Sequence, residues 1–371
     1  MKTICFFSGD ITRAGGTERV STMIANKLVY EKETRILFLS LVEQSRTLFF
    51  PLNKAIKHYV LGKKWINPGL GYLKIIPKLR QFLRQQSVDI IIDIDIVLDI
   101  LSIPAAKGLK TKIISWEHFN YEYEKMSFYR YSILKYSVKR TDYIITLTES
   151  DKRAYQEKLN RKKNISAIYN PMIELSKLSK IDKTDKTKTK EKWLVTIGHL
   201  IKRKGMDYLA KTASLVLKKH RNWKWIVIGE GEERFFLEQI IEKEKLQEQL
   251  ILTGQIKNVN FYLERAQIYV MTSRIEGFPM CLLEAKAFHL PSVSFCIKTG
   301  PDEIIENGKN GYLIPAFDCK KMAEKIEFLI ENEPLRKEFS ENTWNNISKF
   351  QMNIILNAWN KVLGTVYKEI K

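Results

Sequence analysis

The chain of 371 residues carries 62 Lys and Arg against 42 Asp and Glu, a formal net charge of +20, and 44% of its residues are hydrophobic. This length suits two domains, and the apolar content excludes a disordered protein. Four dispersed cysteines without metal-ligand spacing argue against a disulfide framework and a zinc site. The apolar run before Ser8 is too short for a signal peptide and no stretch has the length of a membrane span, so we expect a cytoplasmic protein.

Residues 1–171 alternate short β-branched or aromatic runs with longer amphipathic stretches. Strands are expected over 3–8, 34–41, 89–94, 111–116 and 142–148. Such alternation is typical of a parallel sheet covered by helices. We therefore predict an α/β N-terminal domain over residues 1–171.

Between residues 44 and 88 there are nine basic side chains and no acidic one. This pattern favours an anionic partner, either nucleic acid, lipid head groups or a phosphorylated substrate. Residues 69–85 read as a basic amphipathic helix, which is either an ordinary crossover helix, kinked or restarted at Pro77, or a membrane-surface helix. We expect it to hold the protein at an anionic membrane surface or acceptor through a patch of Lys63, Lys64, Lys74, Lys78, Arg80 and Arg84.

The Lys-rich and Thr-rich segment 172–192 has no sustained period and reads as a linker. After it the alternation resumes, with strands expected over 193–198, 223–231, 250–254, 268–273, 291–295 and 311–314. Residues 193–351 thus form a second α/β domain. A C-terminal helix over about 352–371 is expected to return to the first domain.

In open α/β sheets, ligands bind in the loops that follow the strands. The first such loop contains Gly15 and Gly16 ahead of a helix expected to begin near Thr17. It is either a site where backbone approaches an anion or a flexible turn capped by Thr17. The spacing G-x-G-x-x-G of dinucleotide-binding folds does not occur in this loop.

The first loop of the second domain carries Arg203, Lys204 and Gly205 just before an apolar helix pattern. Arg binds phosphate oxygens bidentately, Lys supplies a compact charge, and a helix N-terminus adds its dipole. We favour a phosphate site over a solvated basic turn.

The stretch "RIEGFPMCLLEAKAF", residues 274–288, places Glu276 in a loop and Glu284 on the helix that follows, with Pro279 in the first turn of that helix. A carboxylate accepts two hydroxyl hydrogen bonds, as a ribose or hexose offers, and burying it without a partner is costly. Both glutamates are therefore candidate hydroxyl-binding residues, and the backbone of Gly277, Phe278, Pro279 and Met280 lies beside them.

Several motifs occur together and in order along nearly the whole chain. They are Gly15-Gly16, "SWEH" at 115–118, "KRKG" at 202–205, "GEGEE" at 229–233, "LTG" at 252–254, "EGFPMCLLE" at 276–284 and "GPDEIIENGKNGYLI" at 300–314. Together they resemble family 4 of the retaining glycosyltransferases, of the bacterial polysaccharide-biosynthesis type. The resemblance implies a GT-B fold, in which two Rossmann-like doubly wound domains face each other across a cleft.

The resemblance also implies roles for individual residues. Glu284 would bind ribose hydroxyls, Arg203 and Lys204 the diphosphate, and Glu276 with the backbone at 277–280 the transferred sugar. Gly16 would lie beside the donor, and His118 and Glu276 would be the catalytic residues. The family usually shows Gly-Arg-Leu where this chain has Gly198, His199 and Leu200, so Arg203 is the candidate for the missing phosphate contact.

The implied reaction is transfer of a hexose from a nucleotide sugar, expected to be a UDP-sugar, to a lipid-linked or oligosaccharide acceptor with retention of configuration. Preorganised cations at the diphosphate would stabilise the leaving group, so we expect neither a metal nor a cofactor. The enzyme would work at the inner face of the cytoplasmic membrane. A GT-B epimerase or phosphorylase remains an alternative, as does, more distantly, a nucleic-acid-binding protein, for which no recognised binding motif was found.

Overall fold

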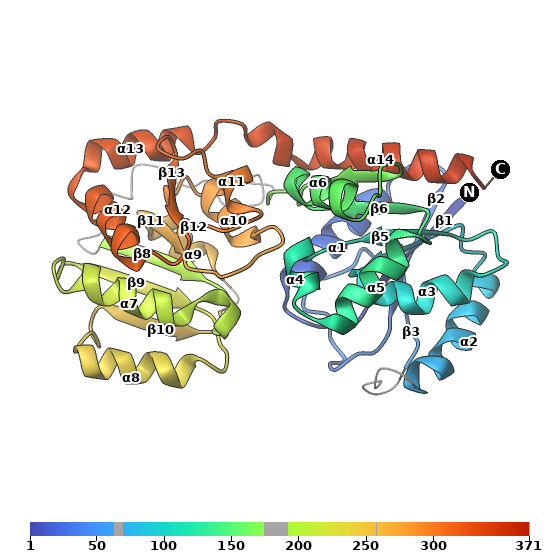
Figure 1. Cartoon of the computed structure of the whole chain (residues 1–371), viewed down its shortest axis with the longest axis horizontal. Coiled ribbons are helices and arrows are strands. Elements are labelled where there is room, and N and C mark those ends of the chain that lie inside the picture. Colours follow the sequence, from blue (N-terminus) through green and yellow to red (C-terminus); the bar gives the residue numbers. More distant parts are fainter. Residues whose placement is uncertain (63–69, 174–191, 257, 371) are drawn as a thin grey trace. The chain divides into compact units, whose positions relative to one another are not determined.

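The computed structural model describes residues 1–62, 70–173, 192–256 and 258–370 (Figure 1). The chain divides into two compact units, which we call unit 1 (residues 1–171 and 352–371) and unit 2 (residues 172–351). Most of the segment predicted to be a linker, residues 174–191, lies outside the described residues.

Unit 1 is built on a parallel sheet of seven strands in the order β3-β2-β1-β4-β5-β6-β7. The strands are β1 (Lys2–Ser8), β2 (Thr34–Ser40), β3 (Lys57–Val60), β4 (Ile90–Ile94), β5 (Lys112–Trp116), β6 (Tyr143–Thr146) and β7 (Ile165–Ala167). All five strands expected from the sequence are present. The edge strands β3 and β7 were not predicted, because their sequences, KHYV and ISA, carry no continuous apolar run.

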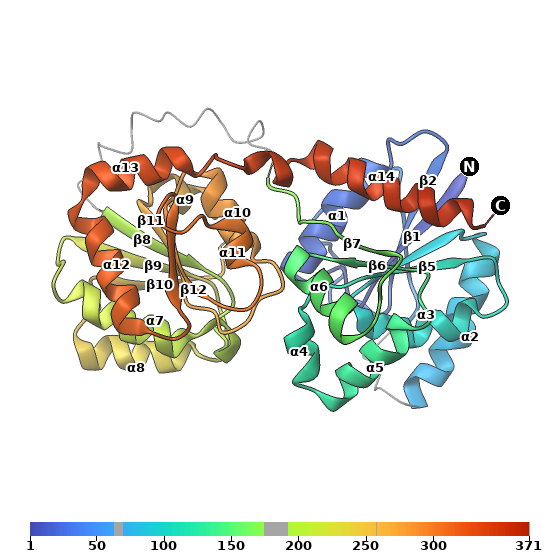
Figure 2. The same ribbon diagram turned by 45° about the horizontal axis from the view of Figure 1, so that its top comes forward.

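Helices cover both faces of this sheet (Figures 1 and 2). They are α1 (Gly16–Leu28), α2 (Leu70–Gln85), α3 (Asp99–Ala106), α4 (Tyr121–Lys125), α5 (Phe128–Val138), α6 (Glu149–Lys158) and α14 (Met352–Lys368), with a short 3-10 turn η1 (Ile96–Leu98). Helix α2 continues through Pro77 and packs on the core with Ile75, Leu79, Phe82 and Leu83. Helix α2 is therefore a crossover helix whose apolar side packs on the sheet. Lys74, Lys78 and Arg84 on its other side are exposed to solvent.

Helix α14 brings the C-terminal residues back to unit 1. It buries one side chain every third or fourth residue, at Ile355, Trp359, Val362, Leu363 and Val366. The Trp359 ring meets the ring of Trp116, at the end of β5, edge to face at 4.7 Å between centroids. The helix is thus part of the core of unit 1.

Unit 2 has a second parallel sheet, in the order β10-β9-β8-β11-β12-β13. Its strands are β8 (Lys192–Ile197), β9 (Trp223–Ile228), β10 (Leu250–Gly254), β11 (Ile268–Met271), β12 (Ser292–Cys296) and β13 (Gly311–Pro315). Its helices are α7 (Met206–Leu217), α8 (Arg234–Glu244), α9 (Asn260–Arg265), α10 (Met280–Ala287), α11 (Pro301–Ile304), α12 (Cys319–Glu331) and α13 (Glu333–Asn342), with two 3-10 turns, η4 (Lys202–Lys204) and η5 (Ile347–Phe350). The prediction of two doubly wound α/β units is confirmed.

In each sheet the strand order reverses at one point, between β1 and β4 in unit 1 and between β8 and β11 in unit 2. The loops after such a pair of strands diverge to opposite faces and leave a crevice where ligands bind in folds of this type. Among the described residues, no helix combines the length and apolar character needed to cross a bilayer.

Candidate active site

At the switch point of unit 2, an ion pair links the loops that follow β8 and β11. Lys204 Nζ, from the loop after β8, lies 2.6 Å from Glu276 Oε1, from the loop after β11. Ser273 Oγ donates a hydrogen bond of 2.6 Å to the same oxygen. The two residues predicted to hold the diphosphate and the transferred sugar are therefore in direct contact.

A glycine allows these two loops to approach each other. Gly205 has a left-handed φ of 70°, and a Cβ atom there would lie 2.0 Å from the carbonyl oxygen of Thr272. Thr272 Oγ1 in turn donates to the carbonyl of Lys204 at 3.2 Å. Only glycine fits this position without displacing the backbone that carries Lys204.

A second ion pair ties the loop after β11 to α7. The Arg274 guanidinium donates two hydrogen bonds to the Asp207 carboxylate, at 2.7 and 2.6 Å, and its backbone N–H donates to the carbonyl of Arg203 at 2.9 Å. Burial would raise the pKa of the Asp207 carboxyl, but the hydrogen bonds and charge of Arg274 outweigh burial and lower that pKa below its usual range. These contacts fix the backbone on which Arg203 and Lys204 are held.

Glu276 is ionised although it is buried, with 7% of its surface exposed. Burial alone would raise the pKa of its carboxyl, but the charge and hydrogen bond of Lys204, together with Ser273 and the charge of Arg203, lower that pKa below its usual range. A buried carboxylate in this state is a strong hydrogen-bond acceptor for sugar hydroxyls.

The segment after Glu276 is held from the side of β12. Thr299 Oγ1 donates to the carbonyl of Glu276 at 2.9 Å, and a Cβ atom on Gly300, which has φ of 100°, would lie 2.7 Å from Pro279 Cδ. Phe278 is buried and packs against Phe350. Pro279 caps the helix and α10 begins at Met280, one residue later than predicted.

Phe278 and Pro279 are buried, whereas Gly277 before them and Met280 after them are partly exposed. Gly277 lies in the loop, and Met280 is the first residue of α10. The N–H groups in the first turn of a helix have no partner within that helix and can bind anions or hydroxyls. Residues 277–280 therefore combine two buried anchors with backbone next to solvent.

Glu284 lies in the second turn of α10 and is 6% exposed. The thiol of Cys281, on the same helix, has its pKa raised to about 11 by burial, with further contributions from the charges of Glu276 and Glu284. Both glutamates therefore lie within electrostatic reach of Cys281. Sequence reasoning did not single out Cys281, Ser273 or Thr299, because each is an ordinary small residue whose role depends on the neighbouring loop.

Arg203 and His199 occupy the same loop as Lys204. Arg203 is partly exposed and its charge lowers the pKa of Glu276, whereas the His199 side chain is exposed. The positive charge of this loop thus comes from Lys202, Arg203 and Lys204, next to the α7 N-terminus.

In unit 1, His118 follows β5, which pairs with β4. The side chain is 7% exposed, and its ring centroid lies 4.5 Å from that of Trp116. Within the described part of the chain, its Nε2 atom has no hydrogen-bond partner. Burial lowers the pKa of His118 to about 3, so the imidazole is neutral. A neutral imidazole can donate one hydrogen bond and accept one, which suits a sugar hydroxyl.

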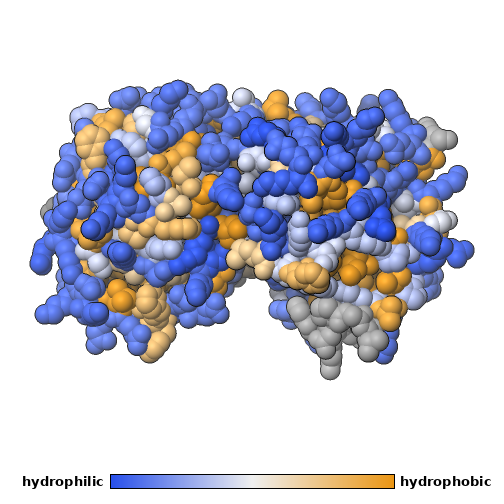
Figure 3. Space-filling model, in the orientation of Figure 1, coloured by the Kyte–Doolittle hydropathy of each residue, from blue (hydrophilic) through white to orange (hydrophobic). Residues whose placement is uncertain are grey.

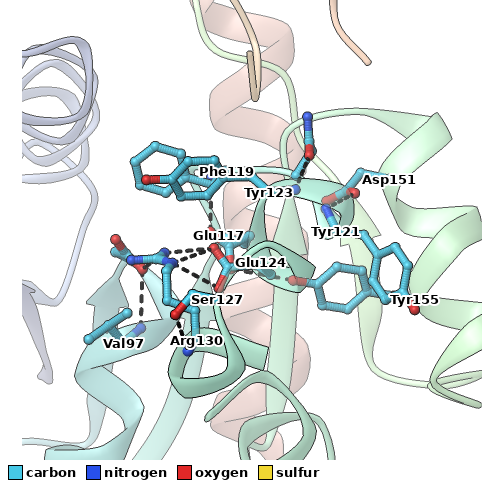
Figure 4. Close-up of polar contacts among 12 residues, drawn as sticks. Val97, Glu117, Phe119, Tyr121, Tyr123, Glu124, Ser127, Arg130, Asp151 and Tyr155 are labelled. Carbon is cyan, nitrogen blue, oxygen red and sulfur yellow. Dashed lines mark hydrogen bonds and ion pairs between the residues drawn. The ribbon is translucent and has the colours of Figure 1, made fainter. Parts of the chain in front are cut away.

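A buried network holds the loop that begins with Glu117 and His118 (Figure 4). Arg130, on α5, binds Glu124 Oε1 at 2.6 Å and Asp95 Oδ1, beyond β4, at 2.9 Å. Glu117 accepts the backbone N–H of Phe119 at 2.9 Å and the Tyr155 hydroxyl at 3.3 Å.

The carboxylates of this network outnumber the single guanidinium, and burial raises the pKa values of Glu117 and Glu124. The pKa of Glu124 rises to about 7, although its bonds to Arg130 oppose that rise, and the pKa of Glu117 lies well above its usual range. Asp95 adopts φ of 85°, a strained conformation of the kind found at functional sites. This network was not predicted from the sequence, because its members are spread over residues 95–155.

The predicted Gly16 is exposed and is the first residue of α1. Gly15 is the residue that has a close neighbour, because a Cβ atom on it would lie 2.2 Å from Glu18 Oε2. Glu18 is buried, and burial raises its pKa despite the charge of Arg13. Gly15 therefore makes room for a buried carboxyl group.

Members of the predicted basic patch have different environments. Lys63 and Lys64 lie outside the described residues. Lys74, Lys78 and Arg84 are exposed along α2. Arg80 instead donates to the carbonyls of Ala105 and Lys107, at 3.0 and 2.6 Å, and so anchors the end of α3.

Two parallel doubly wound units, with a basic loop and an ion-paired glutamate at the switch point of the second, agree with the predicted GT-B fold. A family model described as Glycosyltransferase Family 4 matches residues 14–172, and one described as Glycosyl transferases group 1 matches residues 179–345. An uncharacterised glycosyltransferase of Haemophilus influenzae is 31% identical over 364 residues, which cover 98% of this chain and 100% of that protein. The chain belongs to glycosyltransferase family 4 and is an enzyme of the transferase class.

Two further proteins are similar over nearly their whole length. A polyprenol-linked oligosaccharide α-1,4-N-acetyl-D-galactosaminyltransferase of Campylobacter jejuni is 27% identical over 360 residues, covering 95% of this chain and 96% of that protein. The crystal structure of Anabaena HepE in complex with UDP and glucose has a TM-score of 0.80 at 17% identity, covering 97% of this chain and 99% of that one. The likeness to HepE shows the fold.

Proposed function

We propose that the enzyme is a retaining hexosyltransferase that moves a sugar from a UDP-hexose to a lipid-linked or oligosaccharide acceptor in bacterial cell-surface polysaccharide synthesis. The Lys204–Glu276 pair at the β8–β11 switch point carries this proposal. It combines a cation suited to a diphosphate with an ionised carboxylate suited to sugar hydroxyls, on loops that the backbone holds together.

Breaking the donor bond builds negative charge on the diphosphate and positive charge on the sugar ring. Arg203, Lys204 and the N-terminus of α7 would stabilise the first, and the Glu276 carboxylate the second. His118 would bind a sugar hydroxyl as a neutral imidazole, and Glu284 would bind the ribose. We favour front-face attack by the acceptor, with the leaving phosphate taking its proton.

The donor and acceptor classes are supported by the names of similar proteins. HepE is described in complex with UDP and glucose, and the Campylobacter relative acts on a glycan carried by undecaprenyl diphosphate. Unit 1, with the exposed Lys74, Lys78 and Arg84 on α2, would bind the acceptor and contact the anionic inner face of the cytoplasmic membrane.

Incubation of the enzyme with a panel of labelled nucleotide sugars, with and without an oligosaccharide acceptor, tests the proposal. We expect one UDP-hexose to raise the melting temperature and to give a product whose anomeric configuration, measured by NMR, matches the donor. Conversion of the donor without any acceptor would instead identify an epimerase. An inverted product would overturn the retaining mechanism.

A further inference from the structure

Unit 1 exposes large apolar side chains where α4, α5 and the start of α2 meet. Phe128 is 89% exposed, Met126 76%, Leu73 63% and Tyr129 40%. Burial and a polar interaction with Tyr129, on α5, raise the pKa of Tyr72, on α2, so the first turns of these two helices lie close together. Hydrophilic residues dominate the face drawn in Figure 3, with apolar patches among them. Apolar side chains gathered at one place on a surface mark an interaction site.

Two segments of this region lack acidic residues, whereas α4 carries Glu122 and Glu124. Residues 44–88, which include α2, have none, and neither do residues 125–140, which include α5. The second segment contributes five basic residues, Lys125, Arg130, Lys135, Lys139 and Arg140. Arg130 is used in the buried network, and the other four side chains are exposed, with Lys125 paired to Glu122. Exposed cations on α2 and α5 therefore flank Met126 and Phe128, which we call the apolar tip.

Aromatic rings accompany these cations. The ammonium of Lys135 lies 4.3 Å from the ring centroid of Tyr131, and the guanidinium of Arg140 lies 4.3 Å from that of Tyr136. Tyrosine beside Lys or Arg, next to a protruding apolar group, is the composition of segments that lie at a membrane surface. A protein partner would have to match a basic rim around a few apolar side chains on a turn, whereas an anionic bilayer matches both features at once.

We propose that Met126 and Phe128 insert into the boundary between head groups and acyl chains of an anionic bilayer, while Lys74, Lys78 and Lys135 bind lipid phosphates. This apolar tip adds to the membrane contact of α2 and rests on the proposed function, which puts the acceptor at a membrane. We therefore expect membrane binding to depend on the uncharged side chain of Phe128 as well as on the basic residues.

Vesicle flotation of the full chain tests the tip. We compare the parent, Phe128→Ser and the control Phe235→Ser, whose ring is 68% exposed on α8 of unit 2, using phosphatidylcholine vesicles with and without phosphatidylglycerol. We expect Phe128→Ser to lower the partition coefficient on anionic vesicles about tenfold, with an unchanged salt dependence because no charge is lost. Phe235→Ser should bind as the parent does, and Lys135→Glu should weaken the salt dependence.

Equal partitioning of Phe128→Ser and the parent would overturn the insertion. So would dimerisation of the parent that Phe128→Ser abolishes, without vesicle binding, because a second copy would then cover the tip. Transfer to a short water-soluble acceptor, measured without vesicles, should be the same for the parent and Phe128→Ser. Loss of transfer in both would contradict the proposed function and leave the vesicle result intact.

Discussion

Lys204 and Glu276 lie 72 positions apart in the chain and meet at 2.6 Å in unit 2. Their strands, β8 and β11, are neighbours in the sheet, so the loops that carry them start side by side. The ammonium holds the carboxylate ionised and in one orientation. A donor sugar would therefore meet a carboxylate that is already positioned.

Replacing Glu276 by Gln should lower kcat/KM, because it removes a charged acceptor and leaves Lys204 without its ion pair. We expect the loss of transition-state binding energy to be roughly 2–4 kcal/mol. Glu284→Gln should cost a similar amount, mainly through weaker nucleotide binding. Steady-state kinetics with the identified donor measures both. Glu238→Gln, which breaks only an exposed pair with Arg234, is the control and should be nearly neutral. Parent-like activity of Glu276→Gln would remove its catalytic role.

Changing Gly205 to Ala should destabilise unit 2 and weaken donor binding together. The left-handed backbone costs about 1 kcal/mol for Ala, and the new Cβ atom would push against the Thr272 carbonyl. Gly364→Ala, on helix α14, is the matched control, because a Cβ atom there meets nothing within 4 Å. This variant should stabilise the folded protein by up to about 1 kcal/mol, since Ala favours a helix more than Gly does. Thermal unfolding and isothermal titration with UDP distinguish the two variants. Unaltered UDP affinity in Gly205→Ala would show that the loop contact is dispensable.

His118→Ala should lower kcat far more than it raises the dissociation constant of the donor. The unfolded chain protonates this imidazole near pH 6.5, whereas the folded state, with a pKa of about 3, does not. The unfolded state therefore binds more protons between these values, so His118 should cost the fold roughly 2 kcal/mol at pH 5 relative to pH 7.5. Urea unfolding of the parent and His118→Gln at both pH values measures this difference. A pH-independent difference between them would mean that His118 is protonated in the folded protein.

Arg130→Met should destabilise unit 1 by about 3–5 kcal/mol at pH 8, because it leaves Glu124 and Asp95 without their cation. The pKa of Glu124 is already raised to about 7, so protonation of this residue favours folding at low pH and that stability is lost as pH rises through 7. The variant should therefore recover part of its deficit at pH 5.5. Chemical denaturation at the two pH values is the measurement, and a larger deficit at pH 5.5 would contradict the network's charge assignment.

The sequence predicted the α/β class and eleven of the thirteen strands that the structure describes, because each of these eleven contains an apolar run. It did not predict β3 and β7, which are held by neighbouring strands rather than by their own pattern. It selected Lys204 and Glu276 because both lie in loops that follow strands. Their mutual contact, and the partners Ser273 and Thr299, depend on the order of strands in the sheet, which local pattern does not reveal. The roles of these residues stay predictions.

Helix α14 has a consequence for how the enzyme is made. Trp359 completes a cluster with Phe6 and Trp116, so unit 1 acquires part of its core only after residues 352–371 have been synthesised, which is later than the whole of unit 2. A fragment ending at residue 171 would expose that apolar surface and aggregate. An isolated first unit should therefore be built as a fusion of residues 1–171 with 352–371.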